Sequence, residues 1–141
     1  RMLNDYVVVG AARVIDIAFS IDLILEKNAN EGEIVTNVIT KVSEYFSVDK
    51  MELGEDLALG SLRAFIMTQP GVLNLTDILV FNKVGGNYSQ AVTTQPYINA
   101  TTKQIGLLDD TIYAQPNEIL QIRFPNQDIA VRYKKPSKPV L

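Results

Sequence analysis

The chain has 141 residues, of which 47% are hydrophobic and 21% charged, which fits one domain with a sizeable core or one domain with an extension. It contains neither histidine nor cysteine, so disulfides and thiolate metal sites are excluded and the commonest metal ligand is absent. The net charge of −3 argues against a nucleic-acid surface, and no apolar run reaches the roughly 18–20 residues of a membrane span.

These exclusions favour a binding or structural protein over an enzyme. Any general base would have to be a carboxylate, a lysine or a tyrosine with a strongly shifted pKa. We therefore expect no catalytic residues, no cofactor, no metal and no small-molecule substrate, and neither a nucleic acid nor a membrane as partner.

The first clear element is a strand over Val14–Leu25. Its odd-numbered positions from Ile15 onward are all apolar, whereas Asp16 and Asp22 stand at even-numbered positions. This period of two predicts one face in the core and one largely polar face, as in an antiparallel or mixed sheet that is covered on one side.

A helix is predicted from about Glu31 to Phe46, after a capping-box pattern in which Asn30 is followed by Glu33. Its apolar residues recur at helical spacing and form one stripe: Ile34, Val35, Val38, Ile39, Val42, Tyr45 and Phe46. Burial of each large apolar side chain contributes roughly 1.5–3 kcal/mol, far more than the helix propensity of this β-branched segment. We therefore expect the helix to lie on the apolar face of the first strand.

The next segment contains a loop, a short helix and a second strand. The acidic loop over Asp49–Asp56 fits no calcium-binding pattern and is interpreted as solvated. A helix near Ser61–Thr68 ends at QPG, residues 69–71, because proline lacks the N–H that a helix needs and glycine accepts a positive φ. The strand over Val72–Val84 has apolar residues on both faces, so it is either central in the sheet or covered by a partner.

The composition becomes polar after Gly86. Asn87–Lys103 shows little periodicity and is interpreted as a long ordered loop or arm. Further on, Ile119–Phe124 and Ile129–Lys134 alternate around a four-residue turn, which predicts a β-hairpin. The last residues, Lys134–Leu141, are expected to be mobile.

The predicted fold class is therefore α+β. We expect a small mixed or antiparallel sheet with two helices on one face, plus a C-terminal β-rich arm and hairpin. The predicted division is an α+β domain over residues 1–87, followed by the arm, the hairpin and a basic tail over residues 88–141.

Two patterns that resemble chemical sites have simpler interpretations. Adjacent strand residues point to opposite faces, so Asp109 and Asp110 would not share a proton, and we interpret them as a solvated turn. Lys83 stands before Gly85 and Gly86, whereas a phosphate-binding loop needs its lysine after the glycines and a helix behind it.

A protein interface is the favoured interpretation for several apolar and aromatic residues. Tyr88 and Tyr97 lie in the polar arm, where one small core has difficulty burying them, and aromatic residues often anchor interfaces. Intramolecular packing is the alternative. The full set of predicted interface residues is Tyr88, Tyr97, Ile78, Val80 and Tyr113.

The order of these motifs resembles the C-terminal part of the baseplate J-like family of contractile phage tails. The matching pieces are the strand at 14–25, the helix at 34–46, GEDLALGSL at 54–62 and PGVLNLTDI at 70–78. The segment NKVGGNYS at 82–89, together with residues 109–133, is similar in particular to the large wedge protein of T-even-type baseplates. The resemblance covers about residues 12–135.

This resemblance implies a structural virion protein, located in the tail baseplate and assembled in the host cytoplasm. Its expected partners are a second copy of itself, as a homodimer, and other baseplate wedge proteins. It also implies that the chain is the C-terminal fragment of a longer polypeptide and that residues 1–87 form the baseplate J-like domain.

Two other functions remain open from the sequence. A carbohydrate- or receptor-binding tail module would use Tyr88, Tyr97 and neighbouring amides. A hydrolase would need carboxylates such as Asp109, Asp110 and Glu118 to face each other across a cleft, roughly 5–9.5 Å apart.

Overall fold

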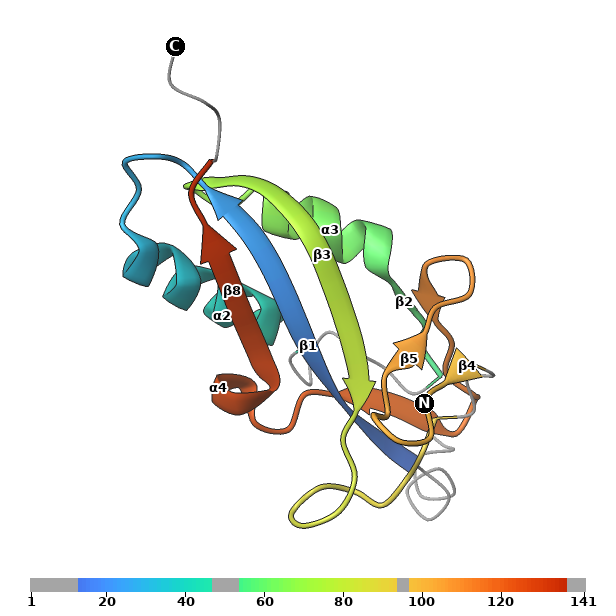
Figure 1. The fold of residues 1–141 in the computed structure, drawn as a ribbon. Coiled ribbons are helices and arrows are strands. Elements are labelled where there is room, and N and C mark those ends of the chain that lie inside the picture. Colours follow the sequence, from blue (N-terminus) through green and yellow to red (C-terminus); the bar gives the residue numbers. More distant parts are fainter. Residues whose placement is uncertain (1–12, 47–53, 94–96, 137–141) are drawn as a thin grey trace.

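The computed structural model describes residues 13–46, 54–93 and 97–136 (Figure 1). An α+β fold is built from three helices and several small sheets among these residues, as the sequence predicts. The elements in chain order are β1 (Arg13–Leu25), α2 (Glu31–Tyr45), β2 (Leu57–Ala58), α3 (Leu59–Met67), β3 (Val72–Asn82), β4 (Tyr97–Ile98), β5 (Ile105–Gly106), β6 (Thr111–Ile112), β7 (Glu118–Gln121), α4 (Pro125–Asp128) and β8 (Ile129–Lys134).

The main sheet is organised around β1, which confirms the predicted first strand. β3 pairs with β1 in the antiparallel sense on one edge. On the other edge, β7 pairs with residues 13–16 of β1 and β8 pairs with residues 19–24, both in the parallel sense. The sheet is therefore mixed and three strands wide, because β7 and β8 follow one another along the same edge (Figure 1).

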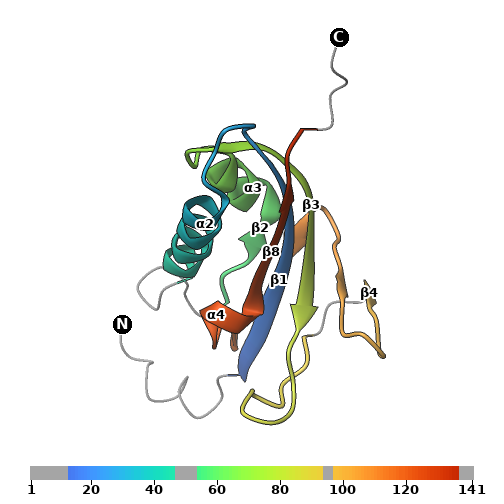
Figure 2. The same cartoon turned by 60° about the vertical axis from the view of Figure 1, so that its left-hand side comes forward.

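Helices α2 and α3 lie on the same face of this sheet (Figure 2), as expected. The odd-numbered residues of β1 from Ile15 to Leu25 are at most 2% exposed. They contact the buried stripe of α2, which consists of Ile34, Val38 and Val42. The period of two in β1 and the helical period of α2 therefore meet in one hydrophobic core.

The predicted N-cap of α2 is present. The side-chain Oδ1 of Asn30 accepts a hydrogen bond from the backbone N–H of Glu33 at 3.2 Å. This bond satisfies one of the N–H groups that have no partner inside the helix, and such caps typically contribute about 1 kcal/mol.

The predicted reversal after α3 is also confirmed. The helix ends at Met67, and Gly71 has a φ of 84°, a conformation that glycine adopts without steric cost. Its carbonyl oxygen accepts a hydrogen bond from the N–H of Glu26 at 2.9 Å. The turn therefore connects the start of β3 to the end of β1.

The predicted C-terminal hairpin is wrong. β7 and β8 run in the same direction, and Pro125–Asp128 forms a one-turn helix, α4, between them. The carbonyl of Phe124 accepts bonds from the N–H groups of Gln127 and Asp128 at 2.9 and 2.8 Å. The short helix lets the chain leave β7 and re-enter the sheet as β8 in the same direction, along the same edge of β1. A tight turn would instead reverse the direction of the chain. Alternation of apolar residues fits both topologies, so it could not distinguish them.

β7 and β8 also bear on the predicted division after residue 87. Both strands belong to the sheet that contains β1 and β3. The division therefore does not separate two hydrophobic cores, because residues 118–134 complete the first one. The predicted mobile tail was Lys134–Leu141; Lys134 is instead the last residue of β8, and residues 137–141 lie outside the described residues. Most of the acidic loop, residues 49–53, also lies outside them.

β3 is an edge strand in this sheet, not the central strand that its apolar faces suggested. Beyond β3, the described residues add only an isolated bridge between Phe81 and Gln104 and the two-residue strands β4 and β5. The second interpretation of β3, a face covered by a partner, stays open.

Candidate interaction surface on the open face of the sheet

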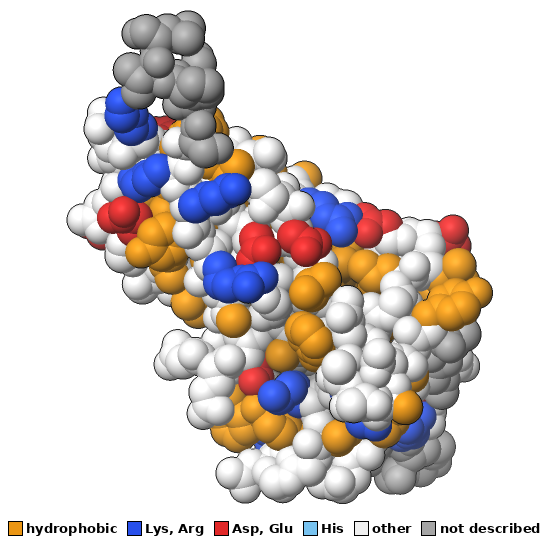
Figure 3. Space-filling model, viewed as in Figure 1, with side chains coloured by type: hydrophobic (Ala, Val, Ile, Leu, Met, Phe, Trp, Pro, Cys, Tyr) orange, Lys and Arg blue, Asp and Glu red, His pale blue; other side chains and the backbone are white. Residues whose placement is uncertain are grey.

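The face of the sheet opposite α2 and α3 carries a mixed apolar and charged surface. We call it the open face and define it by the residues that share it through strand register: Ala18, Ser20, Asp22 and Ile24 of β1; Asp77, Leu79 and Phe81 of β3; and Ala130, Arg132 and Lys134 of β8. Apolar side chains in this view lie next to acidic and basic ones (Figure 3). The arrangement differs from that of the buried face, whose β1 positions are uniformly apolar.

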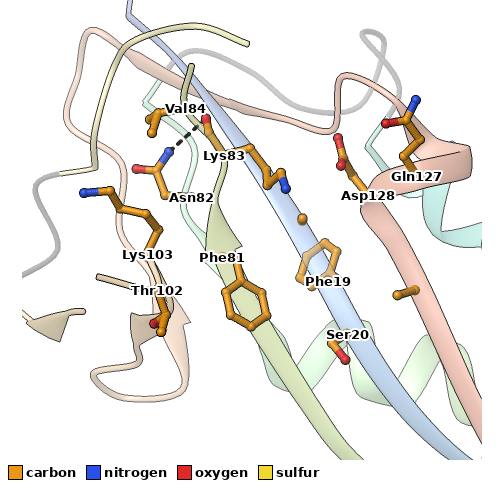
Figure 4. A pocket seen from close by; sticks show the side chains of 12 residues that line it. Phe19, Ser20, Phe81, Asn82, Lys83, Val84, Thr102, Lys103, Gln127 and Asp128 are labelled. Atoms are coloured by element: carbon orange, nitrogen blue, oxygen red, sulfur yellow. Dashed lines mark hydrogen bonds between the residues drawn. The ribbon is translucent and has the colours of Figure 1, made fainter. Parts of the chain in front are cut away.

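A hollow of about 390 Å³ opens at the end of this face near the C-terminus of β3 (Figure 4). Small side chains at Ala18, Ser20 and Ala130 line it, together with the ring of Phe81. Lys83, Lys103 and Asp128 also line the hollow, and they come from three different segments. The hollow exists because neighbouring positions on β1 and β8 carry small residues where β3 carries large ones.

The other end of the open face, away from the hollow, carries an ion pair between β8 and β1. Arg132 of β8 donates from Nε to Oδ1 of Asp22 at 2.8 Å and from Nη2 to Oδ2 at 3.0 Å. This two-pronged geometry is the stronger form of an arginine–carboxylate contact, although both groups are partly exposed to solvent. Asp77 on β3 and Lys134 on β8 make no ion pair with any described residue.

A buried amide fixes the polar segment that follows β3. Asn82 is 1% exposed; its Oδ1 accepts from the N–H of Thr93 at 2.7 Å. Its Nδ2 donates to the carbonyl oxygens of Asp16 at 3.3 Å and Ala91 at 3.4 Å. One side chain therefore connects β1 to residues 91 and 93, which lie nine and eleven positions after Asn82.

Asp16 acts in the same region from β1. It is fully buried, and its Oδ2 accepts from the N–H of Ser89 at 2.7 Å and from Nε of Arg123 at 3.3 Å. Its other oxygen has no hydrogen-bond partner among the described residues. The sequence pattern predicted a polar, outward Asp16, but residues 83–93 cover this end of the face. Alternation with a period of two predicts on which face of the sheet a residue lies. It does not predict whether another segment of the chain covers that face.

Tyr88 is half-buried and packs within its own chain through several contacts. Its ring meets that of Phe124 edge-on at 5.4 Å, and its hydroxyl donates to Oδ1 of Asp128 at 2.9 Å. The ammonium group of Lys83 lies 5.4 Å from the ring centroid, a cation–π contact. Intramolecular packing, the alternative to an interface, therefore accounts for part of the Tyr88 side chain, and an interface role for its exposed part stays a prediction.

Tyr88 also makes stability depend on pH in the alkaline range. Burial, then the hydrogen bond to Asp128, then the charges of Asp128 and Asp16 raise the pKa of Tyr88 above its ordinary value of 10.0. The unfolded chain releases this proton first, so the contribution of Tyr88 is complete below about pH 10 and is lost as the pH rises through the folded-state pKa. We expect Tyr88→Phe to flatten the decline in the free energy of unfolding above about pH 10, measured by urea denaturation at each pH. Parallel declines in parent and variant would contradict this assignment.

The other predicted interface residues divide into buried and exposed. Ile78 is 4% exposed and Val80 is 1% exposed, so both pack in the core beneath α2 and α3 and offer no surface to a partner. This corrects their assignment: the outward residues of β3 are Leu79 and Phe81, one position away from each. Tyr97 is 63% exposed and Tyr113 is 36% exposed, which leaves both accessible.

The carboxylates considered for hydrolysis have separate structural partners. Asp109 and Asp110 lie in an exposed turn with positive φ, as predicted; Asp109 accepts from the hydroxyl of Tyr113, and Asp110 pairs with Arg63. Glu118 is fully buried and pairs with Arg13 at 2.6 Å. In the described part of the chain, no three acidic side chains converge on a possible metal position.

No helix in the described ranges is long and apolar enough to cross a membrane. No family model and no curated protein sequence matches the chain.

Proposed function

We propose that this chain is a structural, non-enzymatic component of a contractile phage tail baseplate. It is the C-terminal part of a wedge subunit, and it acts by binding a second copy of itself and other wedge proteins. Its place is in the virion, after assembly in the host cytoplasm. Nucleic acid, membranes and small-molecule substrates are not among its partners, and it needs no cofactor.

The observation that carries this proposal is the one-sided cover of the sheet. Helices α2 and α3 cover one face, and the open face presents Leu79, Phe81 and a mixed set of charges (Figures 2 and 3). Leu79 and Phe81 are partly exposed, and partly exposed apolar surface that is bordered by charged groups is typical of a protein-binding site. The resemblance of the ordered motifs to the baseplate J-like family is the reason for proposing a phage tail baseplate as the assembly.

The engagement of the buried acids supports the same proposal. Glu118 pairs with Arg13. Asp16 accepts hydrogen bonds from the N–H of Ser89 and from Nε of Arg123. Each of these groups holds one segment of the chain against another. Their arrangement stabilises a scaffold, and a scaffold with one open face is suited to assembly.

The proposal is tested by two measurements on the full chain. Light scattering after size exclusion is expected to give a dimer at tens of micromolar. An antibody against the chain is expected to label the baseplate end of contractile tails produced by the genome that encodes it. A strict monomer would count against homodimerisation, and tails without label would overturn the baseplate assignment.

A carbohydrate- or receptor-binding tail module is the second candidate, and the exposure of Tyr97 favours it. At 63% exposed, this ring is available for stacking on a sugar. Tyr88 does not join it, because that ring packs on Phe124. Glycan-array binding that is lost in Tyr97→Ala would favour this candidate over assembly.

A further inference from the structure

The open face has opposite character on its two sides. On the β3 side its residues are large or acidic, namely Phe81, Leu79 and Asp77. On the β8 side they are small or basic, namely Ala130, Arg132 and Lys134. β1 lies between these two columns and carries the small residues Ala18 and Ser20 next to the hollow. Both side-chain size and charge therefore change from one edge of the face to the other.

The charges are not fully paired within the chain. Arg132 is bound by Asp22 through two hydrogen bonds. Among the described residues, Asp77 accepts only the N–H of its neighbour Ile78, at 2.9 Å, and the ammonium group of Lys134 makes no hydrogen bond or ion pair. β1 separates the two strands, so these unpaired groups of opposite sign stand on opposite sides of the face.

We propose that the open face packs against the open face of a second copy, about a two-fold axis parallel to β1. Such an axis places β3 of each copy over β8 of the other, because it exchanges the two edges of the face. Asp77 then meets Arg132 and Lys134 of the second copy, and the large residues Leu79 and Phe81 meet the small-residue side around Ala130. The contact rests on the proposed assembly role and specifies the surface that performs it.

The self-complementary pattern selects a second copy as the occupant. A face that binds itself about a two-fold axis must carry both halves of every contact, whereas a face for a different protein needs only one half. Size and charge are both reversed across β1, which supplies both halves. Near the axis, Asp22 would approach its own copy, and Arg132 neutralises it within each chain.

Charge reversal tests the predicted contact across the interface. We expect Asp77→Lys and Lys134→Asp each to raise the dimer dissociation constant by about tenfold, and the double variant to restore the parental value to within about threefold. The two groups are separated by β1 within one chain, so the rescue would come from contact between copies. Reversal of Glu44 and Lys41 on α2, at the opposite face, is the matched control and is expected to leave the constant unchanged. Sedimentation equilibrium supplies the measurement.

A cysteine placed near the axis gives an independent readout, because the native chain has no cysteine. Ser20→Cys is expected to give a covalent dimer with a bis-maleimide linker that spans about 10 Å, the spacing of two stacked sheets, whereas the control Ser61→Cys on α3 is expected to remain monomeric on a denaturing gel. If the chain forms a dimer but shows neither the charge-reversal effect nor the crosslink at residue 20, the open face is not the dimer contact, and the assembly role is unaffected. A monomer at tens of micromolar would overturn both the contact and homodimerisation, and would assign the open face to another protein.

Discussion

Replacing Gly71 with alanine is expected to lower the free energy of unfolding by about 2–4 kcal/mol. Two costs combine at this position. A residue with a Cβ at the observed φ of 84° loses roughly 1–2 kcal/mol relative to glycine. The added Cβ would also collide with the Cγ1 and Cδ1 atoms of Ile34, a buried residue of α2. The turn after α3 and the first turns of α2 therefore fit together only without a side chain at residue 71.

Gly85→Ala is the matched control for this prediction. Gly85 has a φ of 85°, and an added Cβ would meet no atom within 4 Å. Its substitution should therefore cost only the backbone part, about 1–2 kcal/mol. Chemical denaturation of both variants separates the backbone cost from the contact with Ile34.

A double-mutant cycle isolates the collision further. Ile34→Val removes the Cδ1 atom that the new methyl group would approach most closely. This change costs about 0.5–1.5 kcal/mol in the parent and should cost less, or stabilise, in the Gly71→Ala background. Additive costs would show that Ile34 moves aside freely and that strain at residue 71 is the whole effect.

The sequence was sufficient for the elements that a single period defines. β1, α2 and the reversal at residues 69–71 were predicted close to their observed bounds, because burial, capping and the conformational limits of proline and glycine act within a few neighbouring residues. The placement of two helices on one face also followed, since the alternation in β1 leaves one apolar face to cover.

The predictions that were wrong depend on which segments lie next to each other in the folded chain. The same alternation at residues 119–134 fits a hairpin or two parallel strands in line, and only the helix Pro125–Asp128 decides between them. Ile78 and Val80 are one position away from the outward residues of β3, and a shift of one residue exchanges the faces of a strand. Asp16 and Asn82 were not recognised as buried, because their partners come from a segment that has little periodicity.

The candidate surface shows the same limit. That β3 is apolar on both faces was visible in the sequence, and a covering partner was one interpretation of it. The hollow near Ala130 and the opposite character of the two edges required strand order, because β3 and β8 are adjacent to β1 and distant from each other in the chain. A surface assembled from three strands has no signature in any one of them.

Asn82→Ala is expected to lower the free energy of unfolding by about 2–4 kcal/mol. The variant removes the acceptor of the Thr93 N–H and the donor that reaches the carbonyls of Asp16 and Ala91. A buried polar group that loses its hydrogen-bond partner costs about 1–3 kcal/mol. Asn82 is 1% exposed, so solvent water does not reach the groups that the variant leaves without a partner. Chemical denaturation of the parent and the variant gives the difference directly.

Asn74→Ala provides the matched control, because Asn74 lies on the same strand but is exposed. Its effect should stay within about 0.5 kcal/mol. Asn82→Asp separates acceptor from donor: it retains the oxygen for Thr93 but loses the N–H groups and buries a charge, so it should be at least as damaging as Asn82→Ala. Hydrogen exchange at the Thr93 amide should accelerate in Asn82→Ala and keep the parental rate in Asn74→Ala. Unchanged exchange at this amide in Asn82→Ala would mean that other contacts hold the segment around Thr93, and that Asn82 contributes to the fold through packing alone.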